Sequence, residues 1–151
     1  MIVLLDTNVV IDYLLQRNQY GYVSKIVDMA IQFKELECIT TTTITDIHYI
    51  VRKNSQTDDG NRLTSYEVQD MLSELFSFIE IIDVTAEDVR NAISLRWKDL
   101  EDAVQYSAAI ANGVDCVVTN NVKDFEKTDI PVFTPRQFLE YIDKSGKDAA
   151  V

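Results

Sequence analysis

The sequence contains few of the residues that build several common kinds of functional site. It has one histidine, two cysteines and four glycines among 151 residues. A single histidine excludes a histidine-rich zinc site, and Cys38 and Cys116 lack the spacing of a metal-binding or nucleophilic pair. Neither G-x-G-x-x-G nor G-x-x-x-x-G-K occurs, so a glycine-rich phosphate-binding loop is not supported.

Long apolar runs are also missing. No segment approaches the roughly 18 apolar residues of a membrane-spanning helix, so no membrane association is expected. The first residues reach Asp6 without a preceding basic residue, which is not the pattern of a secretory signal peptide. We therefore expect a cytoplasmic protein in which both cysteines are buried thiols.

Positive charge is scarce. The chain has 14 Lys and Arg against 25 Asp and Glu, a formal net charge of −11. Proteins that bind nucleic acid through general electrostatic attraction are usually basic. Any contact with nucleic acid must therefore be local or bridged by metal ions, and clustered carboxylates would also attract divalent cations and basic proteins.

Short apolar segments alternate with helical patterns along the whole chain. Residues 2–5 form the unbroken apolar run of a strand buried on both faces. Further strands are predicted at 38–40, 79–84, 116–119 and 131–133, and helices at 23–31, 42–53, 68–75, 85–96, 99–113 and 134–142. The pattern predicts one α/β domain at 1–143 with a mainly parallel central sheet, followed by a frayed tail at 144–151.

Two local details of this pattern are specific. Thr85 is predicted to cap a helix whose apolar residues Val89, Ala92 and Ile93 point inward. The polar segment 54–61 is predicted to be a loop. In a parallel sheet, ligands bind at the carboxyl ends of the strands.

Aspartates recur at those places. Asp6 ends the first strand, Asp99 and Asp102 begin the helix before the fourth strand, and Asp124 follows that strand. Asp46 lies in the helix after the second strand. Carboxylates and amides suit Mg²⁺ or Mn²⁺, which lower the pKa of a bound water and stabilise the leaving oxygen of a phosphodiester. The acids would be ligands first and a general base second.

Each aspartate also has a structural explanation. Asp6 occupies a helix N-cap position, and Asp99 with Asp102 has the spacing of a capping box. Asp46 also fits a solvated helix position, and Asp124 fits a turn. The evidence for a site is the common location of the acids, because no single acid is decisive.

Basic and aromatic residues near the acids leave alternatives open. Arg17, Arg52, Lys53 and Lys123 either hold phosphate groups or keep the surface soluble. Tyrosines would stack on nucleobases if they line the same cleft, and the candidates are Tyr13, Tyr49 and Tyr106. The single histidine, His48, is interpreted as a packing residue.

Four segments, in this order, resemble the motifs of the PIN domain, a metal-dependent nuclease family that includes VapC-type toxins. The resemblance extends from Leu4 to about Tyr141, nearly the whole chain. The segments are LLDTNVVID with Asp6, TDIHYIVRK with Asp46, DLEDAVQ with Asp99 and Asp102, and VTNNVKDF with Asn121 and Asp124. Two positions depart from the common pattern, since many relatives have Glu where Asp46 stands and an acid where Asn121 stands.

The resemblance implies a three-layer α/β fold and Mg²⁺- or Mn²⁺-dependent cleavage of single-stranded or structured RNA. It also implies a homodimer and, for the toxin branch, a small antitoxin that blocks the site. The implied catalytic residues are Asp6, Asp46, Asp102 and Asp124, with Asp99 as a further metal ligand. The implied residues that support the substrate or the ligands are Asn8, Thr119, Asn121, Arg52 and Lys123.

Other functions remain as alternatives. A catalytically weak or inactive PIN-like module that binds RNA or a protein is supported by the departures at Asp46 and Asn121. A phosphoacceptor receiver domain requires an adjacent acidic pair after the first strand, whereas Asp6 is followed by Thr7 and Asn8. A D-x-D phosphatase is disfavoured for a similar reason, because Asn8 occupies the place of its second acid.

Overall fold

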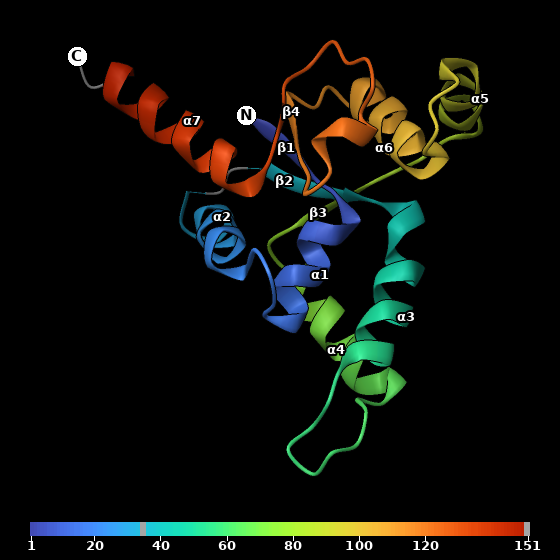
Figure 1. Ribbon diagram of the computed structural model, residues 1–151, viewed down its shortest axis with the longest axis vertical. Helices are drawn as coiled ribbons and strands as arrows, with labels where there is room; N and C mark the ends of the chain where they lie inside the picture. The colour runs from blue at the N-terminus through green and yellow to red at the C-terminus, as the bar shows by residue number, and fades with distance from the viewer. Residues whose placement is uncertain (34–35, 150–151) are drawn as a thin grey trace.

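The computed structural model describes residues 1–33 and 36–149 and contains one parallel sheet with the strand order β3-β2-β1-β4-β5. The strands are β1 (Ile2–Leu5), β2 (Leu36–Thr40), β3 (Glu80–Ile82), β4 (Cys116–Val118) and β5 (Val132–Phe133). Every pair of neighbouring strands is parallel. The central strand is β1, so the end of β1 lies beside the ends of β2 and β4 (Figure 1). The predicted parallel α/β sheet is confirmed.

Helices connect the strands and cover both faces of the sheet (Figure 1). They are α1 (Thr7–Leu15), α2 (Tyr20–Phe33), α3 (Ile44–Asn54), α4 (Ser65–Leu75), α5 (Ala86–Leu95), α6 (Leu100–Ala111) and α7 (Pro135–Ala149). Short 3₁₀ turns occupy Thr41–Thr43 and Val122–Asp124.

Alternate side chains of β1 divide the core into two parts. Val3 and Leu5 pack with apolar residues of α1, α2, α3, α4 and α7. Leu4 packs on the other face with residues of α6, including Tyr106, and with Phe125. Because both faces of β1 are buried, its apolar run has no polar alternation. The three-layer fold expected from the PIN resemblance is therefore confirmed.

The prediction for the apolar side of α5 is wrong in part. Ala92 is buried, but Val89 is 36% exposed and Ile93 is 50% exposed. The reason is that α5 lies outside α6 and packs mainly against that helix instead of the sheet (Figure 1). A helix in this outer position buries a narrower stripe than one that covers a sheet. The predicted cap is confirmed, because the Thr85 side chain accepts a hydrogen bond from the backbone of Asp88.

Several predicted boundaries also differ. The helix predicted from residue 42 begins at Ile44, after the 3₁₀ turn, and the strand predicted at 79–84 covers only Glu80–Ile82. The last helix continues beyond Lys144 to Ala149, although a frayed tail was expected there. The domain boundary at residue 143 stays a prediction.

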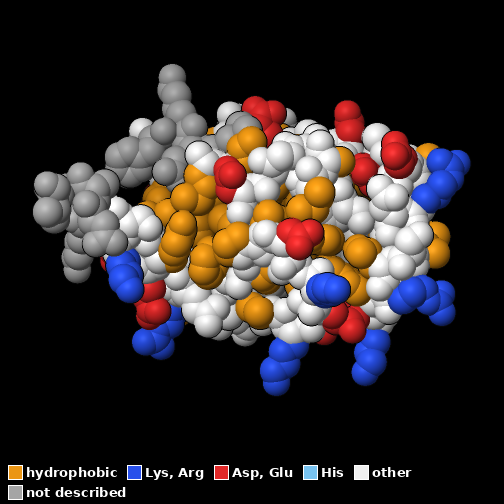
Figure 2. Space-filling view, turned by 90° about the horizontal axis from the view of Figure 1, so that it is seen from above, with side chains coloured by type: hydrophobic (Ala, Val, Ile, Leu, Met, Phe, Trp, Pro, Cys, Tyr) orange, Lys and Arg blue, Asp and Glu red, His pale blue; other side chains and the backbone are white. Residues whose placement is uncertain are grey.

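The surface carries apolar and charged groups together. Figure 2 shows the face seen from above, on which hydrophobic side chains gather between scattered carboxylates, with cations along the rim.

Cys38 and Cys116 are buried thiols, as expected. Among the described helices, none combines the length and the apolar character needed to cross a membrane.

Candidate functional site

Acidic residues converge on one cleft at the carboxyl edge of the sheet. The cleft has a volume of about 290 Å³. Its polar lining contains Asp6, Thr7, Asn8, Asp46, Asp99, Glu101, Asp102, Asn121 and Asp124. These residues come from the segments that directly follow β1 and β4 and from the first turns of α1, α3 and α6. The aspartates proposed from the sequence therefore lie in one cleft, as the strand pattern predicts.

Asp6 is the most firmly held of these acids. It is 3% exposed, and its carboxylate accepts three hydrogen bonds. The Thr7 backbone N–H and the Gln105 side-chain amide donate to Oδ1 at 2.7 and 2.8 Å, and the Thr119 hydroxyl donates to Oδ2 at 2.7 Å. Burial raises the pKa of Asp6, and these three hydrogen bonds partly offset the rise. Asp6 thus begins α1 and faces the cleft at the same time.

Of the two aspartates at the start of α6, Asp99 acts as a helix cap and Asp102 does not complete the capping box. The Asp99 side chain accepts a hydrogen bond of 3.1 Å from the backbone N–H of Asp102, so the cap at Asp99 is confirmed. The capping boxes that begin α4 and α5 show both hydrogen bonds, whereas α6 shows only this one among the described residues. The carboxylate of Asp102 is therefore left for the cleft.

Among the described residues, Asp99, Asp102 and Asp124 form the closest acidic group. One carboxylate oxygen of each lies within 4.8 Å of the others. Burial, followed by the neighbouring charges of Asp6, Asp99 and Asp124, raises the pKa of Asp102 to about 8. Oxygen ligands at this spacing suit a hard divalent cation, whose charge would also offset the repulsion among the carboxylates. The residues present therefore fit Mg²⁺ or Mn²⁺.

Sequence reasoning missed two side chains of the site. Glu101 lines the cleft and accepts a hydrogen bond of 3.1 Å from the Thr7 hydroxyl, and burial with the nearby Asp46 raises its pKa. Gln105 is fully buried, and its Oε1 has no hydrogen-bond partner among the described residues. A usable signal existed for Gln105, since it follows Asp102 by three positions on a helix and such residues share a face.

The remaining sequence candidates are divided between this cleft and its surroundings. Asp46 is an exposed residue in the first turn of α3 and lines the cleft outside the closest acidic group. Thr119 is fully buried, and its hydroxyl donates a hydrogen bond to the carboxylate of Asp6. The same hydroxyl accepts a hydrogen bond of 3.0 Å from the backbone N–H of Asn121. Two cations lie outside the lining of the cleft: Arg52 in a neighbouring pocket and Lys123 on the exposed turn after β4.

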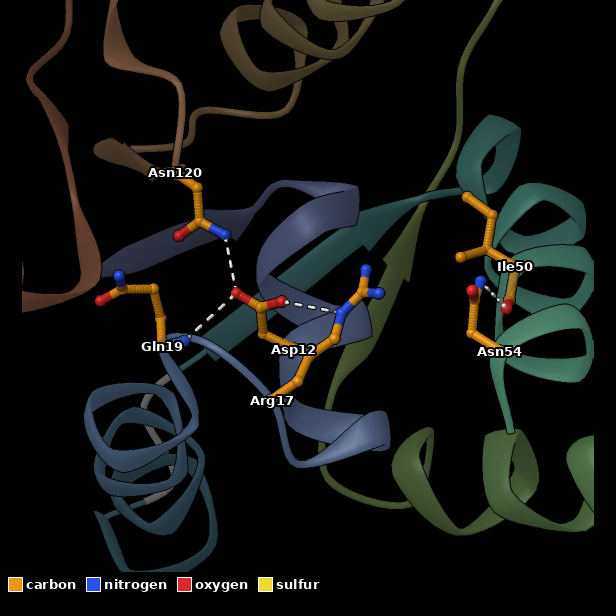
Figure 3. A network of polar contacts seen from close by, with 6 residues as sticks. All are labelled: Asp12, Arg17, Gln19, Ile50, Asn54 and Asn120. Carbon is orange, nitrogen blue, oxygen red and sulfur yellow. Dashed lines mark hydrogen bonds and ion pairs between the residues drawn. The ribbon is translucent and has the colours of Figure 1, made fainter. Parts of the chain in front are cut away.

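A buried carboxylate outside the cleft holds the segment that follows β4. Asp12 is 2% exposed, and its Oδ2 accepts a hydrogen bond of 2.9 Å from the Asn120 side-chain amide (Figure 3). Its Oδ1 lies 3.3 Å from Nε of Arg17. This network ties α1 to the residues just before Asn121 and Asp124. Arg17, one of the four candidate phosphate-binding cations, is therefore paired with Asp12.

Comparison with known proteins finds similar chains among VapC ribonucleases and VapBC complexes. Ribonuclease VapC1 of Aquifex aeolicus (strain VF5) is 28% identical over 144 residues, which cover 91% of this chain and 93% of that protein. Among solved structures, DNA-bound VapBC from Salmonella typhimurium matches with a TM-score of 0.65 at 19% identity, over 89% of this chain and 98% of the other. VapBC2 from Rickettsia felis, bound to a promoter DNA fragment, matches with a TM-score of 0.62 at 22% identity, over 88% and 97%.

The structural matches agree with the three-layer fold described above. At the level of sequence, the PIN domain profile matches residues 2–123, which include Asp6, Asp46, Asp99 and Asp102 and end one residue before Asp124. The match covers far more than half of the chain. This chain belongs to the PIN domain family.

Proposed function

We propose that this protein is a metal-dependent endoribonuclease and the toxin of a toxin–antitoxin pair. The observation that carries the proposal is the convergence of Asp6, Asp102 and Asp124, from three distant parts of the chain, on one cleft of a PIN domain. The similarity to a curated ribonuclease over nearly the full length of both chains supports the same activity.

The roles of the acids follow from their positions. Asp99, Asp102 and Asp124 are the proposed metal ligands, and Asp6 is a further ligand held in place by Gln105 and Thr119. A bound Mg²⁺ or Mn²⁺ supplies a water of lowered pKa and stabilises the leaving oxygen of the phosphodiester.

The other cleft residues have supporting roles in this proposal. Asp46 faces the cleft from α3 as an additional catalytic acid, and Glu101 adds negative charge at the opposite helix start. Asn8 and Asn121 line the cleft with amides, which suit contacts with substrate oxygens. Lys123, on the exposed turn that carries Asp124, is a proposed contact for a substrate phosphate.

A protein partner is part of the proposal. The similar solved structures include a toxin–antitoxin complex from Klebsiella pneumoniae and a toxin from Mycobacterium tuberculosis that cleaves the sarcin–ricin loop. For this chain we infer a small antitoxin that blocks the cleft, and the carboxylates there favour basic groups on it. A homodimer stays a prediction. The proposed compartment is the cytoplasm, whose reducing conditions suit the thiols of Cys38 and Cys116.

Cleavage of RNA by purified protein tests the activity. We expect cleavage with Mn²⁺ or Mg²⁺, none in EDTA, and losses of at least about a hundredfold for Asp6→Asn and Asp102→Asn. Asp28→Asn, at an exposed position of α2, is the matched control. Equal cleavage in EDTA would exclude the metal mechanism. Binding of RNA without any metal-dependent cleavage would favour the alternative, an inactive PIN-like module.

A further inference from the structure

A second pocket lies on α3 next to the acidic cleft, and its charge has the opposite sign. It is lined by His48, Tyr49, Arg52, Lys53 and Arg62. We call it the basic pocket. A lining with three cations and no acid is a local reversal in a chain that has 14 Lys and Arg against 25 Asp and Glu. The same helix supplies Asp46 and Ile50 to the acidic cleft, so the two hollows are neighbours.

The loop after α3 completes the basic pocket. Ser55 is buried, and its hydroxyl donates to the carbonyl of Arg52 at 3.1 Å and accepts from the backbone N–H of Leu63 at 3.2 Å. The loop reverses direction near Gly60, whose φ of +83° is accessible to glycine with little strain. These contacts return the chain to the end of α3 and place Arg62 beside the helix cations.

The three cations are available to a ligand. Arg52, Lys53 and Arg62 are exposed, and the ion pairs of the described residues lie elsewhere, at α1 and within α7. The Arg52 side chain donates from Nε to the carbonyl of Leu63 at 3.4 Å, which orients its guanidinium along the loop. Asp59, at the tip of the loop, directs its carboxylate to the backbone and side-chain amides of its own loop.

Tyr49 adds an aromatic surface to the cations. It is 64% exposed, and Nζ of Lys53 lies 6.0 Å from the centroid of its ring. Asp46, Tyr49 and Lys53 occur at the i, i+3 and i+7 positions of α3, which place them along one side of the helix. A rise of 1.5 Å per residue separates the acid at the cleft from the outer cation by about 10 Å along the axis.

We propose that the basic pocket binds single-stranded RNA next to the cleavage point, with phosphates at Arg52, Lys53 and Arg62 and a base stacked on Tyr49. The inference rests on the proposed ribonuclease function and specifies the form of its substrate, which is unpaired beside the cleaved bond. Stacking on a side chain requires the face of a base, and a duplex hides that face. The pocket also explains how an acidic protein holds RNA, because attraction at one place does not require a basic net charge.

Binding measured without cleavage tests this proposal. A short fluorescent single-stranded RNA of mixed sequence is titrated with protein in EDTA, and its anisotropy is followed at several salt concentrations. We expect Tyr49→Ala to weaken binding about tenfold or more without changing the salt dependence. Arg52→Ala and Lys53→Ala should each lower the slope of log K against log salt by about 0.7. The controls Tyr22→Ala and Lys25→Ala, both on α2, should bind as wild type does.

Two further probes decide the outcome. With the same RNA in a duplex, Tyr49→Ala should have no effect, whereas the charge variants should still weaken binding. The proposal is overturned if the pocket variants bind single-stranded RNA as the α2 controls do. It is equally overturned if those variants still bind RNA but no longer bind an acidic polyglutamate peptide, since the ligand of the pocket is then a protein.

The same experiment separates this proposal from the proposed function. If wild type cleaves RNA with Mn²⁺ but Tyr49→Ala has no effect on binding or cleavage, the basic pocket is refuted and the nuclease stands. If wild type binds RNA through Tyr49 but never cleaves it, the nuclease is refuted and the RNA-binding pocket stands.

Discussion

The side-chain amide of Gln105 donates a hydrogen bond of 2.8 Å to Oδ1 of Asp6, and the same nitrogen lies 3.4 Å from Oδ1 of Asp102. One buried amide therefore connects the acid at the end of β1 with the acid in the first turn of α6. It fixes the orientation of both carboxylates before any ion binds. Groups that orient metal ligands in this way strongly affect metal affinity.

We predict that Gln105→Leu raises the Mn²⁺ concentration needed for half-maximal thermal stabilisation, and for half-maximal cleavage, by about 10- to 100-fold. The fold should survive, because leucine fills a similar buried volume and Asp6 keeps its hydrogen bonds from Thr7 and Thr119. Mn²⁺ titrations of the thermal midpoint, without RNA, measure the affinity directly, and titrations of cleavage measure it independently. Gln32→Leu, at an exposed position of α2, is the matched control. An unchanged Mn²⁺ response in Gln105→Leu would contradict the positioning role.

We predict that Asp102→Asn leaves the metal-free protein at least as stable as wild type near neutral pH. In wild type the folded protein either holds a negative charge in a crowded cluster or takes up a proton to remove it, and asparagine avoids both costs. Among the described residues, the carboxylate of Asp102 caps no backbone N–H of α6. The stabilisation that Mn²⁺ provides should shrink, since it depends on the affinity of the folded state for the ion. Thermal melts with and without Mn²⁺ provide the measurement. A destabilised variant with the full Mn²⁺ response would remove Asp102 from the metal site.

The raised pKa of Asp102 predicts how stability depends on pH. The carboxyl has a pKa of about 8 in the folded protein, against an ordinary value of 3.8. Between these values the folded state binds a proton that the unfolded state releases, so the metal-free protein should lose stability as the pH rises toward 8. Wild type should lose free energy of unfolding between about pH 5 and pH 8, and Asp102→Asn should make this loss smaller by more than about 1 kcal/mol. Urea denaturation at both pH values tests this, and equal pH dependence in the two proteins would contradict it.

We predict that Asp12→Ala lowers the free energy of unfolding by about 1–3 kcal/mol, because the half-buried amide of Asn120 and the side chain of Arg17 both lose their acceptor. Asp12→Asn keeps an oxygen for Asn120 and should cost less. Urea denaturation of both variants, with Asp28→Ala as the exposed control, shows whether Asp12→Ala loses more stability than Asp12→Asn. Stability of Asp12→Ala equal to that of the control would show that the network in Figure 3 contributes little.

The sequence alone determined the features that depend on neighbouring residues. The apolar run before Asp6 identified a strand buried on both faces, and Thr85 identified a helix start, because such caps join groups three positions apart. The order of strands and helices then placed the aspartates at one edge of the sheet. Where local periodicity was insufficient, as for Val89 and Ile93, the sequence contained no sign that α5 packs on another helix instead of the sheet.

Only the tertiary structure decided which side chains act together. Gln105 and Asp6 are 99 positions apart, and Asn120 and Asp12 are 108 apart, so no local pattern relates them. The pKa of Asp102 is likewise a property of burial and of charges contributed by several segments. Hydrogen bonds and electrostatic interactions depend on distance in space, and packing of the sheet and its helices determines that distance.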